Sequence, residues 1–382
     1  IPADLVLECF PGQFRNWFYS LLAMSTMMEN IPPFKTLVGH SPVRDADGEE
    51  MHKSKGNAIW FDQAVEEVGA DVMRWQYLEH ELANNLNFSF DKLKQIRGKF
   101  FNTLWNSYAF YINYALLSDY KPGDQRSEVK NRTNIDRWII SRLQILVKEC
   151  RDSMDNFDTR RVCKLMESFV DDLSNWYIRL NRRRFWQEKD NEDTVYAFDT
   201  LFECLYTVAK ILAPMVPMIT EEMYQNMIRA VDSKAPESVH LLSYPQMESD
   251  KIDNAVLEQM ELIIKVTNAA LFARQKAKIK TRQPLSSLEI SLRREQDQQA
   301  IKDFTDLLKG ELNIKEIILL DSALEMPVSL KVKPNLKVLG TEFKSEIKAI
   351  SEAIMANEAE IAGQIKNKNY PIKVDTGIKV YE

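Results

Sequence analysis

The 382-residue sequence is poor in the residue types that hold metals and disulfides. It has four histidines and four cysteines, and Cys9, Cys150, Cys163 and Cys204 are scattered without a C-x-x-C pair. This spacing argues against a structural zinc site and against a disulfide framework. We expect no metal site, and reduced, partly buried thiols in a cytoplasmic protein.

Other features are also scarce. The 11 glycines and 14 prolines argue against long low-complexity linkers. No run of 18 apolar residues is present, so we expect no transmembrane helix and no membrane partner. The formal net charge is −6, so any contact with nucleic acid must come from local basic patches. The length predicts two to four domains at about 100–200 residues each.

Several catalytic signatures are missing as well. There is no Gly-x-Ser-x-Gly elbow, Walker A loop or Gly-x-Gly-x-x-Gly turn. The chain opens on the strand-like run "IPADLVLECF", without a secretory signal and without an initiator Met. We interpret it as a piece of a larger protein.

The first sixty residues predict a βαβ unit. Two strand-like runs, "ADLVLECF" and "KTLVGHSPV", flank a segment with helical apolar spacing, "QFRNWFYSLLAMSTMMEN". This order favours a parallel sheet. The loop "EMHKSKGN" follows the second strand, and ligands of such sheets bind outside the carboxyl ends of the strands.

Residues from about 62 to 230 predict a helical bundle. Gly69 is expected to break a helix in two, and Asp158 to cap another. Pro214 and Pro217 are expected to end or kink a third helix, which Thr220 would restart.

Residues after about 255 predict an α+β module. It would contain one helix over 254–282, strands at 286–292, 314–320 and 328–338, and a helix over 344–366. Residues 231–254 are interpreted as the linker before it.

The loop "EMHKSKGN" has two interpretations. It is either a solvated charge cluster or a loop that handles phosphate, because ammonium groups neutralise phosphate oxygens and glycine lets backbone N–H groups come close. A second candidate is Glu8, with Gln13, Arg15 and Trp17. Its carboxylate, at a strand end, could bind an amine or a ribose, or the segment could be an ordinary turn into a helix.

Two basic segments are candidates for RNA contact. In "NWYIRLNRRRFW", Arg179, Arg182 and Arg183 fall at i, i+3 and i+4, whereas Arg184 lies about 100° further round and is a candidate for pairing within the protein. The alternative is a solvated helix face, and Trp176 and Trp186 are expected to belong to the core. The second segment, "RQKAKIKTR", either tracks a phosphate backbone or complements a helix dipole. Its basic residues are Arg274, Lys276, Lys278, Lys280 and Arg282.

Together these segments resemble class I aminoacyl-tRNA synthetases of the isoleucyl type. "DGEEMHKSKGN" is similar to the Lys-Met-Ser-Lys-Ser signature loop, and "PADLVLECFPGQFRNWFYSLLAMST" resembles the adenylate-pocket strand and helix. "NWYIRLNRRRFW", "APMVPMITEEMYQN" and "SVHLLSYP" resemble the anticodon-binding helical domain. "ARQKAKIKTRQPLSSLEI" and "VKPNLKVLGTEF" resemble the C-terminal module of eukaryotic-like members.

The resemblance implies roles for individual residues. Lys53, with Ser54, would act on the ATP phosphates in the adenylation transition state. The residues implied to bind ATP or the adenylate are Glu8, Gln13, Trp17, His40, Met51, His52 and Lys53. Those implied to bind tRNA are Arg179, Arg182, Arg183, Arg274, Lys276, Lys278 and Lys280.

The sequence also departs from the family. Glu50 stands in place of the first signature Lys and His52 in place of the Ser, which changes the loop's charge and pH dependence. Pro11-Gly12 alters the pocket segment, so Gln13 aligns only with a one-residue insertion. The His-Ile-Gly-His signature is absent, which favours the C-terminal portion of a synthetase.

The implied fold is mostly α with α/β and α+β parts. The end of a Rossmann-like domain would cover 1–61, stem-contact helices 62–125, an anticodon-binding bundle 126–250 and an α+β tRNA-binding module 251–382. The implied activity is ATP- and Mg²⁺-dependent activation of isoleucine and its transfer to tRNA(Ile), in a cytoplasmic monomer. A valyl, leucyl or methionyl relative and a non-catalytic tRNA-binding paralogue remain alternatives.

Overall fold

The computed structural model describes most of the chain. The described residues are 2–9, 12, 14–122, 128–187, 191–292, 294, 296–320, 332–336, 339, 343–366, 374–375 and 380–381. The chain divides into two compact units. One comprises Ile1–Ser286 and Gln299–Lys315, and the other Ser287–Gln298 and Glu316–Glu382.

The N-terminal segment is a βαβ unit, as predicted. Strands β1 (Ala3–Cys9) and β2 (Phe34–His40) are parallel and are joined by α1 (Trp17–Met28). Phe18 is the buried residue of α1 and stacks on Phe34 with ring centroids 5.7 Å apart. Two short strands follow, β3 (Val43–Arg44) and β4 (Leu86–Asn87), which also pair in parallel.

The next segment is helical. Helices α2 (Phe61–Val68) and α3 (Ala70–Glu79) meet at Gly69, whose φ of 91° lies in the region that favours glycine, and this confirms the predicted break. A π-helical turn, η2 (Arg97–Phe101), joins α4 (Phe90–Ile96) to α5 (Asn102–Leu117).

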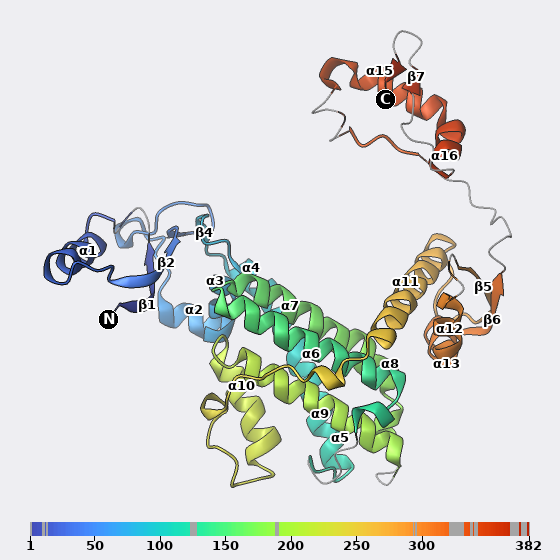
Figure 1. The fold of residues 1–382 in the computed structure, drawn as a ribbon, viewed down its shortest axis with the longest axis horizontal. Helices are drawn as coiled ribbons and strands as arrows, with labels where there is room; N and C mark the ends of the chain where they lie inside the picture. The colour runs from blue at the N-terminus through green and yellow to red at the C-terminus, as the bar shows by residue number, and fades with distance from the viewer. Residues whose placement is uncertain are drawn as a thin grey trace. The chain divides into compact units, whose positions relative to one another are not determined.

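The bundle is built around α6, which packs against both α7 and α9 (Figure 1). Asp158 caps α7 by accepting the N–H of Arg161, as predicted. Proline ends one helix and begins another: α9 stops before Pro214, and Pro217 is the first residue of α10, three residues before the predicted restart. The bundle comprises α6 (Asn134–Asp155), α7 (Thr159–Asp171), the π-helix η4 (Asp172–Ile178), α8 (Arg179–Asn181), α9 (Glu192–Leu212) and α10 (Pro217–Tyr224).

Two side chains of α3 form hydrogen bonds with the turn between α9 and α10. Asp71 accepts the backbone N–H groups of Met218 (3.4 Å) and Ile219 (2.8 Å), at the start of α10. Arg74 donates from Nε to the carbonyl of Met215 and from Nη2 to that of Pro214. Asp71 and Arg74 therefore hold the backbone before and after Pro217.

The remaining elements correct the sequence analysis in three places. The helix predicted over 254–282 ends at Lys276, and the one predicted over 344–366 is divided at Asn357. Within the predicted strand 328–338, the described residues 332–336 form no strand. The helices are α11 (Asn254–Lys276), α12 (Gln296–Asp303), α13 (Thr305–Leu312), α15 (Ile347–Ala356) and α16 (Glu358–Lys366). The strands are β5 (Leu285–Ser291) paired with β6 (Ile314–Leu320), and β7 (Val374–Asp375) antiparallel to β8 (Val380–Tyr381).

Short helical turns complete the described part of the chain: η1 (Lys53–Lys55), η3 (Val129–Asn131), η5 (Arg184–Trp186), the π-helical η6 (Gln225–Arg229), η7 (Val239–Leu241), η8 (Ser249–Lys251) and η9 (Lys344–Glu346). None of the helices in the described residues has the length and apolar character needed to cross a bilayer.

Candidate functional site

The lysine-rich loop presents its charges to solvent. Lys53, Ser54 and Lys55 form the 3₁₀ turn η1, and all three side chains are exposed. Gly56 ends the turn in the left-handed conformation (φ 74°), which a side chain would strain. The sequence predicted such an exposed loop after the second strand.

The base of this loop is tied together by two side chains. Asn57 Nδ2 donates to Asp45 Oδ2 (2.7 Å) and to the Glu50 carbonyl (3.1 Å), while Asn57 Oδ1 accepts the N–H of His52 (2.9 Å). Asp45 also accepts the N–H groups of Asp47 and Glu49. The hydrogen bond from Asn57, followed by the backbone one from Glu49, lowers the pKa of Asp45. We call this arrangement the loop staple.

Sequence reasoning missed the loop staple. Asp45 stands two residues before Asp47-Gly48, a spacing typical of an Asx turn, and this signal could have been used. Asn57 gave no such signal, because its partners lie up to twelve residues away.

The loop's charged side chains find partners nearby. The ammonium of Lys53 lies 4.8 Å from the centre of the Trp60 ring, a cation–π contact. Glu50, which replaces a lysine of the family pattern, lies 3.5 Å from His52 Nε2 and 3.7 Å from Arg44 Nη2. The two departures from the signature therefore face each other.

The carboxyl edge of the parallel strands carries two more predicted residues. Glu8 is opposite Gly39, and Cys9 is opposite His40, so Glu8 and His40 lie on neighbouring strand ends. Glu8 is only 4% exposed and accepts the N–H of Cys9. His40 Nδ1 lies 3.0 Å from the Ser41 carbonyl oxygen.

The other predicted pocket residues are less closely defined. Trp17 opens α1 and is exposed, with its ring edge-to-face on Phe18. Met51 is half-buried before η1. Gln13 lies outside the described residues.

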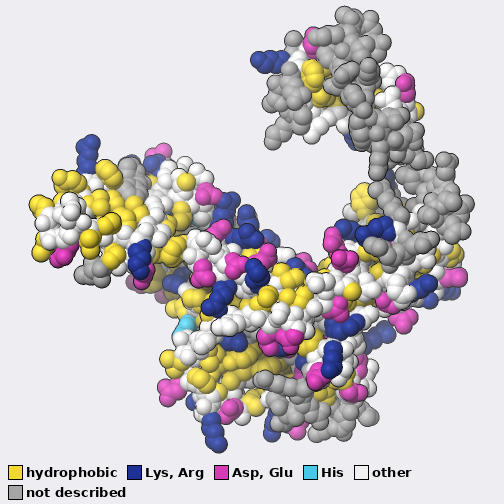
Figure 2. Space-filling model, viewed as in Figure 1, with side chains coloured by type: hydrophobic (Ala, Val, Ile, Leu, Met, Phe, Trp, Pro, Cys, Tyr) yellow, Lys and Arg dark blue, Asp and Glu magenta, His cyan; other side chains and the backbone are white. Residues whose placement is uncertain are grey.

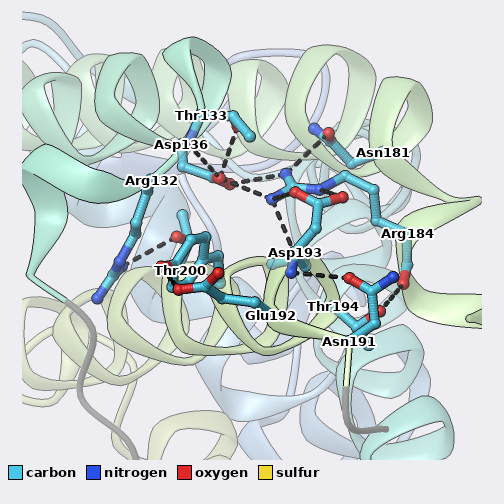
Figure 3. A network of polar contacts seen from close by, with 12 residues as sticks. Arg132, Thr133, Asp136, Asn181, Arg184, Asn191, Glu192, Asp193, Thr194 and Thr200 are labelled. Atoms are coloured by element: carbon cyan, nitrogen blue, oxygen red, sulfur yellow. Dashed lines mark hydrogen bonds and ion pairs between the residues drawn. The ribbon is translucent and has the colours of Figure 1, made fainter. Parts of the chain in front are cut away.

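A buried network fixes the arginine-rich segment (Figure 3). Arg184 donates from Nη1 and Nη2 to the two carboxylate oxygens of Asp136 (2.9 and 2.7 Å) and from Nε to Asp193 (2.9 Å). Asp136, 0% exposed, also accepts from the hydroxyls of Thr133 and Tyr177. Burial, and then the charge of Asp136, raises the pKa of Tyr177. Arg184 thus pairs within the protein, as its helical phase suggested.

The neighbouring arginines face outward. The assigned helix α8 ends at Asn181, but Arg182 and Arg183 keep right-handed helical angles, so the i, i+3, i+4 spacing from Arg179 still applies. Arg182 and Arg183 are exposed, and neither forms an ion pair within the described part of the chain. Trp186 is 59% exposed, so the expectation that it belongs to the core is wrong.

These arginines border an open groove of about 750 Å³. One wall is formed by residues 179–184 with Trp186, and the other by acidic and apolar residues of the segment 303–311. The groove is therefore lined by the exposed Arg182 and Arg183 and by carboxylates of residues 303–311, together with Asp193, which pairs with Arg184.

The second basic segment is different. Arg274 is 5% exposed and donates to the carbonyls of Lys280, Gln283, Leu312 and Asn313. Because its guanidinium is buried and already binds these backbone carbonyls, we do not retain the expectation that Arg274 contacts RNA. The exposed lysines of this segment are Lys276, which ends α11, and Lys278 and Lys280, which follow the helix.

No cluster of three or more His, Cys, Asp or Glu side chains suited to a metal ion occurs among the described residues.

Comparison with known proteins identifies the family. Residues 1–89 match the model of "tRNA synthetases class I (I, L, M and V)", and residues 136–290 match that of the "Anticodon-binding domain of tRNA ligase". The isoleucine–tRNA ligase of Clostridium novyi is 38% identical over 98% of this chain and 36% of its own length. The chain belongs to the class I tRNA synthetases.

Further relatives of this synthetase chain agree. The isoleucine–tRNA ligase of Bacteroides thetaiotaomicron is 34% identical over 100% of this chain and 33% of its own length. The chain thus spans about a third of the length of these curated relatives. The LeuRS of Agrobacterium radiobacter K84, solved as a ternary complex with tRNA and LeuAMS, shares the fold with a TM-score of 0.51 at 16% identity. That match covers 85% of this chain and 38% of the other.

Proposed function

We propose that this chain works as part of an isoleucine–tRNA ligase, which activates isoleucine with ATP and Mg²⁺ and transfers it to tRNA(Ile). The observation that carries the proposal is the stapled lysine loop beside a parallel strand edge, in a chain whose relatives are isoleucine–tRNA ligases. In this proposal the segments 1–61, 62–125, 126–250 and 251–382 are the catalytic, stem-contact, anticodon-binding and C-terminal tRNA-binding parts.

Lys53 is the proposed phosphate ligand. Its ammonium sits on an exposed turn whose base is fixed, so it can move to the phosphates as negative charge develops on them. Ser54 would assist it. Glu8 would contact the aminoacyl-adenylate, with Gln13, Trp17, His40, Met51 and His52 around the nucleotide.

The proposed tRNA surface includes Arg182 and Arg183, which are exposed and without ion-pair partners among the described residues. Arg179 belongs to the same face. Lys276, Lys278 and Lys280 would add phosphate contacts from the end of α11. We also propose that the ligase is a cytoplasmic monomer.

The catalytic proposal is tested by Lys53→Ala in the longer ligase that contains this chain. Isoleucine-dependent exchange of pyrophosphate into ATP should fall by roughly 10²–10³, because the variant lacks a donor that acts in the transition state. Isoleucine binding should change little. Lys55→Ala, which removes a neighbouring charge of the same turn, is the matched control. An unchanged exchange rate for Lys53→Ala would leave the loop a solvated charge cluster.

The tRNA proposal is tested with this chain itself and a transcript of tRNA(Ile). Changing both Arg182 and Arg183 to Ala should weaken binding and flatten the log–log salt dependence by roughly 0.7–0.9 for each phosphate that the variant no longer neutralises. A transcript of tRNA(Leu) gives the comparison for specificity. Equal affinity for both transcripts would remove the support for an isoleucine-specific anticodon site in this chain.

A further inference from the structure

One of the three outward arginines is already neutralised by the protein. Arg179 Nη1 lies 2.5 Å from Glu311 Oε1, although the two residues are 132 positions apart in the sequence. The Glu311 side chain is only 10% exposed, whereas that of Arg179 is 43% exposed. The ion pair therefore spans the groove from the bundle to α13.

Glu311 is held in place from behind. Leu308 and Leu312 of the same helix are fully buried, and Arg274 donates to the Leu312 carbonyl (2.6 Å). Helix α13 packs against α11. This packing fixes the backbone that carries Glu311, and the Glu311 side chain is less exposed than that of Arg179, so Arg179 is the partner with more room to move.

The wall of the groove formed by the end of α12 and by α13 carries three carboxylates. Asp303, Asp306 and Glu311 line that wall, opposite Arg182 and Arg183. A carboxylate occupies a guanidinium much as a phosphate does, since both accept charge-assisted hydrogen bonds. Glu311 occupies Nη1 of Arg179, while Nε donates to the Asn175 carbonyl, so an RNA phosphate competes with Glu311 for Nη1 and for the charge of this arginine.

We propose that Glu311 is a built-in competitor of RNA: it masks Arg179 and holds the RNA affinity of the groove below that of three free arginines. RNA is bound by Arg182 and Arg183, and Arg179 joins only when it leaves Glu311. This inference rests on the proposed binding of tRNA by the bundle.

The test uses Glu311→Gln in this chain with a tRNA(Ile) transcript. Glutamine keeps the shape and removes the charge, so affinity should rise about fivefold, the worth of an ion pair of this exposure. The log–log salt slope should steepen by roughly 0.7–0.9, because one more phosphate is neutralised. Glu258→Gln, an exposed carboxylate of α11 outside the groove, controls for the removal of one negative charge.

A second background separates masking from general charge. In Arg179→Ala, the change Glu311→Gln should have no more effect than Glu258→Gln. The inference is overturned if Glu311→Gln matches Glu258→Gln in the unmodified background, or if it weakens binding, since Glu311 would then itself contact RNA. Failure of the unmodified chain to bind any tRNA would instead refute the proposed function, and the inference with it.

Discussion

Asp136 shows how much a single residue can depend on its neighbour. Its carboxylate is fully buried, and its charge is balanced by the bidentate guanidinium of Arg184. Removing one member of a buried ion pair leaves the other charge without compensation. The network thus couples the end of the α7–α8 helix to the starts of α6 and α9.

We therefore expect Arg184→Ala to lower the free energy of unfolding by about 3–5 kcal/mol. The measurement is urea denaturation followed by far-UV circular dichroism. Arg182→Ala, two residues away and exposed, should change it by no more than about 0.5 kcal/mol. Equal unfolding midpoints for the two variants would contradict this account.

At the scale of single residues, the sequence predicts the direction of a side chain where that direction depends only on its angle around a helix. Arg184 was separated from its neighbours by its angle on the helix, and the network agrees. Arg274 was not, because the four carbonyls that it binds converge from residues 280–283 and 312–313 only in the folded chain. Trp186 was misassigned because aromatic composition does not indicate which ring ends at the surface.

At the scale of the elements, Asp71 connects α3 to the start of α10, and its charge can be tested. Burial raises the pKa of Asp71, and the hydrogen bonds from Ile219 and Met218 oppose this only in part. The folded state therefore binds a proton at Asp71 more tightly than the unfolded state does. Stability gained through this proton appears as the pH falls through the raised pKa, and above it the ionised carboxylate is a net cost.

Two substitutions separate the hydrogen bonds from the charge. Asp71→Ala removes the acceptor for two N–H groups and should cost about 0.5–2 kcal/mol at pH 7, like the removal of a helix cap. Asp71→Asn has one acceptor oxygen, so it can keep the bond from Ile219 (2.8 Å) but loses the longer one from Met218 (3.4 Å) together with the charge. It should lose less stability than Asp71→Ala at pH 7, and its stability relative to the unmodified chain should decrease as the pH falls through the raised pKa. Thermal unfolding between pH 4 and 7 measures both, and an Asn variant as unstable as the Ala variant would refute the charge argument.

Glycine and proline explain which element boundaries were predictable. Gly69 permits a positive φ, and the boundary there was found in the sequence. Pro217 was expected to end or kink a helix, but it begins α10, three residues before the predicted restart. The π-helical turns η2, η4 and η6 were not, because an i→i+5 hydrogen bond is selected by packing rather than by residue type. The end of α11 was missed because basic residues continue beyond the helix without a Gly or Pro.

On the scale of the whole molecule, the N-terminal βαβ unit carries much exposed apolar surface (Figure 2). Leu7, Tyr19, Met24, Met27 and Met28 are all exposed. A contiguous apolar area of this kind promotes association or the binding of hydrophobic molecules.

We expect the chain to enhance the fluorescence of a hydrophobic dye, and the double change Met27→Gln and Met28→Gln to reduce that signal. A matched pair, Met218→Gln and Met355→Gln, removes two exposed methionines elsewhere. It should leave most of the fluorescence. If both doubles reduce the signal equally, the dye binds without preference for the βαβ unit.

The loop staple also bears on how fast Lys53 can move. Because Asn57 holds the backbone of His52 and Glu50, the ammonium does not need the loop to rearrange in order to leave Trp60. Rotation about the bonds of an exposed side chain takes picoseconds to nanoseconds, whereas loop motions take nanoseconds to microseconds. Typical enzymes turn over at about 10 s⁻¹, so in the function proposed above the movement of Lys53 from the indole ring to a phosphate is much faster than turnover.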